Sequence, residues 1–165
     1  MTNGLLNGRE CDTAPVPSTI LVCTDGSELA AQAAAAGLAI LQPADRVEVV
    51  TVADIDATYA YDGSGHAGPT MTEAQWRVHR EAALEQATGV VQRAARELGI
   101  DPACGRVLEG VPGPALCDYA HETSAGAIVI GTRGRGGIKR ALLGSVSDFV
   151  VRNAPCPVVV VGAQS

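Results

Sequence analysis

A glycine-rich stretch near the C-terminal end of the chain has the composition of an anion-binding loop. Glycine occupies most of positions 131–137, where it permits positive φ angles and lets successive N–H groups approach one anion. Gly144 and Ser145 then precede apolar residues at helical spacing, which predicts a helix over 145–153. A phosphate at its first turn would meet free N–H groups, the positive end of the helix dipole and the Ser145 hydroxyl. The spacing therefore predicts a phosphate-binding site.

The same residues also fit a simpler interpretation. The loop would then be a flexible turn, and Ser145 with Asp148 would only cap the helix. Two common nucleotide sites are not expected in either case. The chain lacks the G-x-x-x-x-G-K-[ST] pattern of a P-loop, and Gly134-x-Gly136 is not completed by a glycine at Lys139, as a standard NAD site would require.

Four basic residues lie in the same region of a chain whose net charge is -6: Arg133, Arg135, Lys139 and Arg140. They either attract phosphates or form a solvated loop surface, and the sequence does not separate the two interpretations. A triphosphate lying along this segment would contact one or two of them.

An acidic loop, Thr24-Asp25-Gly26-Ser27, follows an apolar run at 19–23. Asp25 could contact a ligand, or it could only stabilise the N-terminus of the following helix, where a negative charge is worth about 0.3–1 kcal/mol. Thr24 would help to orient the loop, and Ser27 fits a plain N-cap.

Short β-branched runs alternate with helical patterns from Thr19 onward, which predicts a β-α-β series. We expect strands at 19–23, 47–52, 105–109, 127–130 and 158–161, and helices at 27–41, 72–98, 114–122 and 145–153. The long helix follows a loop at 53–71 and begins with the capping box Thr72-Glu73-Ala74-Gln75. Strands joined by right-handed helical crossovers form a doubly wound parallel sheet with helices on both faces, in a flavodoxin-like or a Rossmann-like strand order.

The acidic loop and the glycine-rich loop come together if the strand order is 3-2-1-4-5. Ligands of such sheets bind at the carboxyl ends of the strands, beside the point where the strand order reverses. That point lies between the first and fourth strands. The residues just past these strands are 24–27 and 131–134.

Length and composition suit one α/β domain. The chain has 165 residues, of which 47% are hydrophobic but only 3% aromatic, so Ala, Val, Leu and Ile must fill the core. We expect a flexible leader at 1–17, where Gly and Pro interrupt polar residues, and a single domain over 18–165.

The charge balance bears on partners and location. A net charge of -6 and a pI near 4.9 argue against binding to nucleic acid or to an anionic membrane. Apolar runs such as Val158–Val161 are far shorter than the roughly 20 residues of a membrane helix, and the N-terminus lacks a signal pattern. We therefore expect a cytoplasmic protein with no nucleic-acid or membrane partner.

Cysteine and histidine spacing does not predict a metal site. The 5 cysteines are widely spaced without a C-x-x-C pair, which favours reduced thiols, two or three of them packed inside strands or helices. His66, His79 and His121 are scattered, and His121-Glu122 lacks the second histidine of the H-E-x-x-H motif of zinc hydrolases.

The pattern Gly131-x2-Gly134-x9-Gly144-Ser145 resembles the G-x2-G-x9-G-[ST] signature of the ATP-binding universal stress proteins. The run 20–27 resembles the opening strand and acidic loop of that family, and 154–160 resembles its closing strand. The resemblance covers roughly residues 18–162. It implies a Rossmann-like fold of the adenine nucleotide alpha-hydrolase kind, with strand order 3-2-1-4-5.

The resemblance also implies which residues would hold the base and the sugar. Asp25 would contact the ribose region, and Gly131 would line the ribose. The backbone at Val52 and at Ile130 would hold the adenine edge.

The phosphates of ATP would lie further along the signature. Gly134, Gly144, Ser145 and Val146 would surround them, with Ser147 at the rim. Mg²⁺ or Mn²⁺ would bridge the phosphate oxygens, which are the hard ligands these cations prefer.

The family resemblance favours an ATP-binding sensor or regulator of the stress response, with slow or no ATPase activity. Fast phosphoryl transfer needs a group that positions the attacking water, and the sequence does not single one out. Three alternatives stay open: a metal-dependent ATPase using Asp25 or Asp54, a dimeric interaction module that binds no nucleotide, and a binder of AMP or cAMP.

The last strand predicts an interface. Val158–Val161 would lie at an edge of the sheet, and exposed apolar edges are normally paired or covered. The family resemblance implies a homodimer through this strand. The rival interpretation is that a helix or the leader covers it.

Overall fold

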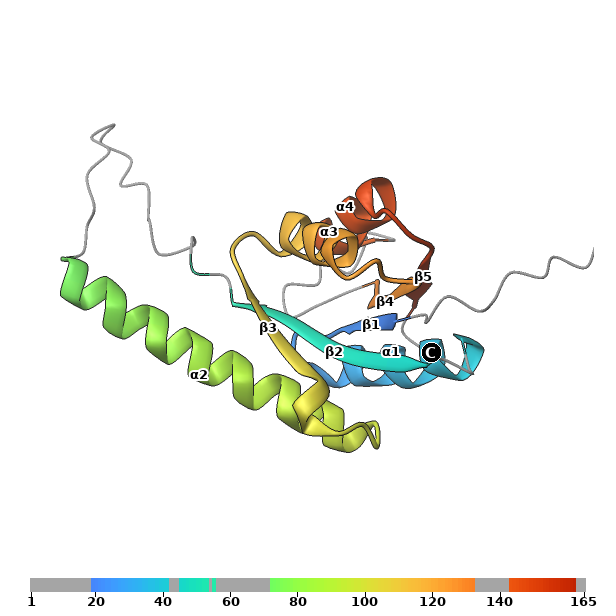
Figure 1. The fold of residues 1–165 in the computed structure, drawn as a ribbon, viewed down its shortest axis with the longest axis horizontal. Coiled ribbons are helices and arrows are strands. Elements are labelled where there is room, and N and C mark those ends of the chain that lie inside the picture. Colours follow the sequence, from blue (N-terminus) through green and yellow to red (C-terminus); the bar gives the residue numbers. More distant parts are fainter. Residues whose placement is uncertain (1–18, 42–44, 54, 56–71, 133–142, 163–165) are drawn as a thin grey trace, which may run out of the picture.

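A computed structural model of the protein describes residues 19–41, 45–53, 55, 72–132 and 143–162. Five parallel strands form one sheet in the order β3-β2-β1-β4-β5 (Figure 1), which confirms the predicted order. The strands are β1 (Thr19–Cys23), β2 (Arg46–Ala53), β3 (Gly105–Glu109), β4 (Ala127–Gly131) and β5 (Val158–Val161).

Helices cover both faces of this sheet. They are α1 (Glu28–Leu41), α2 (Glu73–Glu97), α3 (Pro112–Glu122) and α4 (Ser145–Asn153), with a short 3₁₀ helix, η2 (Pro102–Cys104), before β3. The helices α1 and α2 lie on one face, and α3 and α4 lie on the other (Figure 1). None of the helices in the described ranges is long and apolar enough to span a bilayer.

The two sides of β1 and β4 belong to two different core clusters. Leu21 and Ile128 pack with α3 and α4, whereas Val22 and Val129 pack with α1. All four side chains are fully buried. Because both faces of these strands are covered, their residues form continuous apolar runs without polar alternation.

The structure confirms all nine predicted strands and helices and moves several of their ends by one or two residues. The capping box is present, with the Thr72 hydroxyl accepting from the Gln75 N–H and the Gln75 side chain accepting from the Thr72 N–H. The predicted start of α3 at Pro114 was two residues late, because the first turn of a helix also tolerates Pro112. The strand β2 continues to Ala53, which we had expected to begin the loop.

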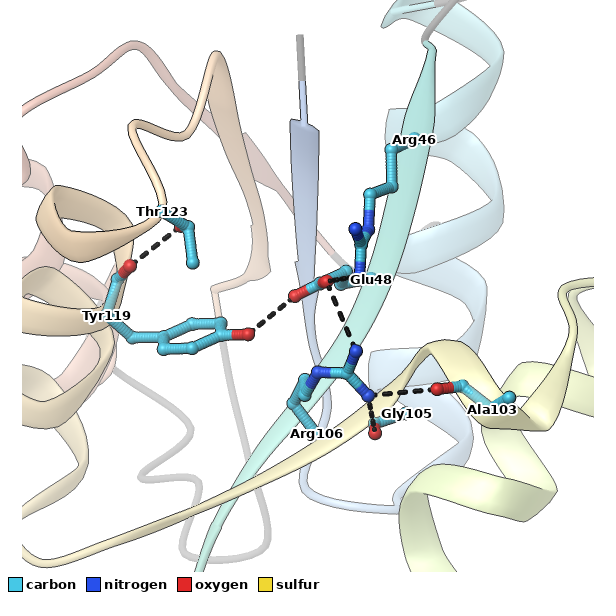
Figure 2. A network of polar contacts seen from close by, with 7 residues as sticks. All are labelled: Arg46, Glu48, Ala103, Gly105, Arg106, Tyr119 and Thr123. Atoms are coloured by element: carbon cyan, nitrogen blue, oxygen red, sulfur yellow. Dashed lines mark hydrogen bonds and ion pairs between the residues drawn. The ribbon is translucent and has the colours of Figure 1, made fainter. Parts of the chain in front are cut away.

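A buried carboxylate links β2, β3 and α3 near the amino ends of the strands. Glu48 is only 3% exposed, and Figure 2 shows three side chains converging on it. Arg46 lies 2.6 Å and Arg106 3.6 Å from its Oε1, and the Tyr119 hydroxyl donates to Oε2 at 2.7 Å. Burial, and then the bond to Glu48, raise the pKa of Tyr119, so its hydroxyl stays protonated as a donor. A buried charge is tolerated here because it is fully paired.

Helix α1 packs against β4 through a glycine. A Cβ atom at Gly37 would lie 2.3 Å from Cγ1 of Val129, a distance that no real side chain tolerates. Glycine at this position therefore sets how closely α1 approaches the sheet.

We expect Gly37→Ala to lower the free energy of unfolding by about 1–3 kcal/mol, because the added methyl group overpacks a filled core. Gly89 in the middle of α2 is the matched control, since a Cβ there meets nothing within 4 Å. Gly89→Ala should raise the free energy of unfolding by about 0.5–1 kcal/mol. Urea unfolding measures both changes, and a Gly37→Ala protein as stable as wild type would contradict the close approach.

Candidate functional site

The two loops singled out in the sequence leave neighbouring strands at the same edge of the sheet. Strands β1 and β4 pair directly, with Val22 opposite Val129. The loop after β1 and the loop after β4 therefore both begin at the switch point of the strand order, where doubly wound sheets bind ligands.

The loop Thr24–Ser27 is shaped by hydrogen bonds from its own side chains. The Thr24 hydroxyl accepts from the Gly26 N–H at 3.0 Å, and Oδ1 of Asp25 accepts from the Ser27 N–H at 3.0 Å. Gly26 has a φ of 79°, which a glycine adopts without strain. The Ser27 hydroxyl accepts from the Ala30 N–H, so Ser27 is the N-cap of α1, as predicted.

A second buried threonine, Thr51 of β2, forms a hydrogen bond to the same loop. Its hydroxyl donates to the Thr24 carbonyl oxygen at 2.7 Å, and the Thr24 N–H donates to the Val50 carbonyl at 2.9 Å. Both threonines are buried, with 6% exposure for Thr51 and 9% for Thr24. Thr51 could not be singled out from the sequence, since a threonine within a β-branched run looks like an ordinary strand residue.

Hydrogen bonds from Gly144, Thr132 and Ser147 hold the two ends of the glycine-rich loop in place. The Gly144 N–H donates to the Thr132 carbonyl at 2.7 Å, and the Thr132 N–H donates to the Val161 carbonyl at 2.9 Å. The Ser147 hydroxyl lies 3.0 Å from the Gly144 carbonyl and 3.4 Å from that of Thr132. Ser147 is 2% exposed, so its side chain acts inside this junction.

Helix α4 begins without a side-chain cap. Its N-cap residue is Gly144, which has no side chain to accept the first N–H groups, and Ser145 is the first helical residue. The simpler interpretation, in which Ser145 and Asp148 cap the helix, does not hold. The Asp148 carboxylate instead pairs with Arg152 one turn later, at 3.0 Å.

The remaining predicted site residues fall into two groups. The first group is described: Ile130 is buried, and Val52, Val146 and Gly131 are partly buried. Val52 lies near the carboxyl end of β2, Ile130 and Gly131 at that of β4, and Val146 in the first turn of α4. Gly134 and the four basic residues Arg133, Arg135, Lys139 and Arg140 lie outside the described residues.

The cysteines behave as apolar residues in the part of the chain that is described. Cys23 ends β1 directly before the acidic loop and is buried, and burial together with the nearby Cys117 and Cys156 raises the pKa of its thiol to about 12. Cys104 is also a free thiol. No three His, Cys, Asp or Glu side chains among the described residues are grouped so as to hold a metal ion.

The sequence of this chain is similar to one protein-family model and to several known proteins. A family model described as the universal stress protein family matches residues 18–162. A universal stress protein of Methanocaldococcus jannaschii is 35% identical over 145 residues, which span 86% of this chain and 80% of the relative. One of Thermus aquaticus is 36% identical over 143 residues, spanning 87% of this chain and 97% of the relative.

Two solved structures share the fold. The universal stress protein UspA from Lactobacillus plantarum gives a TM-score of 0.69 at 23% identity, covering 90% of this chain and 99% of its own. A universal stress protein in complex with cAMP gives a TM-score of 0.56 at 20% identity, covering 91% of this chain and 100% of its own.

The junction at Ser147 can be tested by removing its hydroxyl. We expect Ser147→Ala to lower the free energy of unfolding by about 1 kcal/mol, the usual net contribution of one hydrogen bond. Ser145→Ala, which truncates an exposed serine two positions earlier in the same helix, should change it by less than about 0.5 kcal/mol. Thermal unfolding of the pair measures the difference, and equal midpoints would show that the junction does not depend on this hydroxyl.

Proposed function

This chain belongs to the universal stress protein family, and from that premise we propose that it binds ATP at the carboxyl edge between β1 and β4 and acts as a nucleotide-dependent regulator of the stress response. The observation that carries the proposal is the first turn of α4. The N-cap of this helix is a glycine, so its N-cap residue offers no side-chain acceptor to the first N–H groups, at the end of a complete G-x2-G-x9-G-[ST] signature.

The triphosphate would lie along the glycine-rich loop and at the start of α4. The N–H groups of Ser145 and Val146 and the positive end of the helix dipole suit an anion there, and Gly134 and Gly144 allow it to come close. The exposed Ser145 hydroxyl adds one donor, and Arg135 of the basic segment adds charge. The buried Ser147 hydroxyl would hold the two ends of the loop together, since it already faces backbone carbonyls.

The nucleoside would lie toward β1 and β2. Asp25 and Gly131 would flank the ribose, with the Thr24 turn holding Asp25 in place, and the main chain of Val52 and Ile130 would face the adenine edge. Mg²⁺ or Mn²⁺ would be held mainly through the phosphate oxygens, because no cluster of acidic or histidine ligands is formed by the described residues.

We expect ATP hydrolysis to be slow or absent, because fast phosphoryl transfer needs a group that orients the attacking water and the sequence does not single one out. A metal-dependent ATPase would use Asp25 or Asp54 to hold the cation. A second candidate ligand is cAMP or AMP, since a related structure was solved in complex with cAMP. Competition calorimetry ranks ATP against these nucleotides.

The first test is the nucleotide that the purified protein carries. Mass spectrometry after denaturation should detect ATP in wild type and none in Gly144→Val, whose side chain would block the first turn of α4. Calorimetry with Mg-ATP should give a Kd about 100-fold higher for that variant, since each lost charged hydrogen bond costs about 1.5–3 kcal/mol. Released ADP would favour the ATPase, and released AMP would favour the AMP-binding alternative.

A second variant separates loop shape from ligand contact. Asp25→Asn keeps an oxygen that can accept a hydrogen bond from the Ser27 N–H but removes the charge. We expect this variant to bind Mg-ATP more weakly than wild type. Asp118→Asn, on the exposed side of α3, is the matched control and should bind as wild type. If wild type neither carries nucleotide nor binds added Mg-ATP, the nucleotide proposal fails and the interaction module takes its place.

We also propose a cytoplasmic homodimer in which two copies pair along β5. This strand is the outer strand of the sheet, and its four valines are only partly buried. The carbonyls of Pro157 and Val161 accept from Ile128 and Thr132 on the β4 side. Because the hydrogen-bonding direction alternates along a strand, the Val160 N–H points toward the open edge, where a second copy could pair.

This alternation offers a selective test of the dimer. Val160→Pro removes an N–H that β4 does not use, so the fold should persist while edge pairing is lost. We expect sedimentation velocity to show a dimer for wild type and for Val160→Thr, which keeps the N–H, and a monomer for Val160→Pro. A dimer that survives in folded Val160→Pro would place the interface elsewhere.

A further inference from the structure

We infer that Thr51 is a positioning residue of the nucleotide site: its hydroxyl ends the pairing of β1 with β2 and thereby leaves the Val52 main chain facing the ligand. This inference rests on the proposed function and adds to it a residue outside the glycine signature. Three observations carry it, namely the Thr51 hydrogen bond, the burial of both threonines and the direction of the strand ladder.

The ladder between β1 and β2 would ordinarily continue by one more bond. The Thr24 N–H donates to the Val50 carbonyl, so in a continued parallel ladder the Thr24 carbonyl would accept from the Val52 N–H. The Thr51 hydroxyl takes that carbonyl instead, at 2.7 Å. A side chain thus replaces the backbone donor at the point where β1 and β2 separate.

The direction of the Val52 main chain follows from the same alternation. Val50 directs its carbonyl toward β1, and Ala53 directs its carbonyl toward β3, where it accepts from the Gly110 N–H at 3.2 Å. Val52 has the same parity as Val50, so its N–H and C=O point to the β1 side, beyond the end of that strand. An N–H beside a C=O in this place matches an acceptor and a donor on the edge of adenine.

The Thr51 bond also determines where Thr24 lies. With its N–H on Val50, its carbonyl on Thr51 and its hydroxyl on the Gly26 N–H, each polar group of Thr24 has a partner. The turn that carries Asp25 is therefore anchored to β2 through one buried hydroxyl. Glycine or valine at position 51 would leave the Thr24 carbonyl without this donor.

The test compares Thr51→Val, which keeps the shape and removes the hydroxyl, with Thr51→Ser, which keeps the hydroxyl. In calorimetry we expect the Kd for Mg-ATP to rise about tenfold in Thr51→Val, as the loss of roughly one hydrogen bond predicts, and to stay within about twofold of wild type in Thr51→Ser. The Kd for Mg-GTP should rise less than the Kd for Mg-ATP, because GTP has the same ribose and phosphates as ATP but presents a different base edge. The inference would be overturned if Thr51→Val raised the Kd for ATP and the Kd for GTP equally. It would also be overturned if Thr51→Ser bound Mg-ATP as weakly as Thr51→Val.

A second readout needs no nucleotide and so separates this inference from the proposed function. In Thr51→Val the freed Thr24 carbonyl can accept the Val52 N–H, and amide exchange at Val52, followed by NMR, should slow about tenfold relative to Thr51→Ser. Unchanged exchange would overturn the role of Thr51. Failure of wild type to bind any nucleotide would overturn the proposed function. Slower exchange of the Val52 amide in Thr51→Val would still support the inference that the Thr51 hydroxyl ends the pairing of β1 with β2.

Discussion

The position of β1, hydrogen-bonded to β2 on one side and to β4 on the other, is the constraint on which the other elements depend. From this central strand the chain moves outward to β3 and then returns to β4 and β5. Right-handed crossovers in these two opposite directions must run over opposite faces, so α1 and α2 cover one face and α3 and α4 the other. The same reversal brings the loops after β1 and β4 to one edge of the sheet.

The polar groups at the two ends of the sheet are satisfied in different ways. At the amino ends, the buried Glu48 is neutralised by Arg46 and Arg106, and it needs them because an unpaired buried charge would be very costly. At the carboxyl ends, the hydroxyls of Thr51 and Ser147 donate to backbone carbonyls. These neutral bonds shape the loops, and the N-cap of α4 is a glycine, which offers no side-chain acceptor to the first turn.

Much of the fold could be predicted because its signals are local. Apolar runs, the capping box at Thr72 and the alternation of strands with helices each depend on residues within a few positions of one another. The early start of α3 was missed for a related reason, since Pro112 and Pro114 both suit a first turn and the sequence offers no further mark between them. The strand order itself followed from the family resemblance, because periodicity alone allowed two orders.

The sequence by itself determined the element types, the glycine signature and the membership in the universal stress protein family that the family model then bore out. Only the tertiary structure decided that Thr51 holds the Thr24 loop and that Tyr119 meets Glu48, contacts between residues 27 and 71 positions apart. It also decided that Gly37 must be small, because Val129 comes from a distant strand. Hydrogen bonds and steric limits between such residues leave no periodic trace along the chain, so they become visible only when packing has brought the strands and helices together.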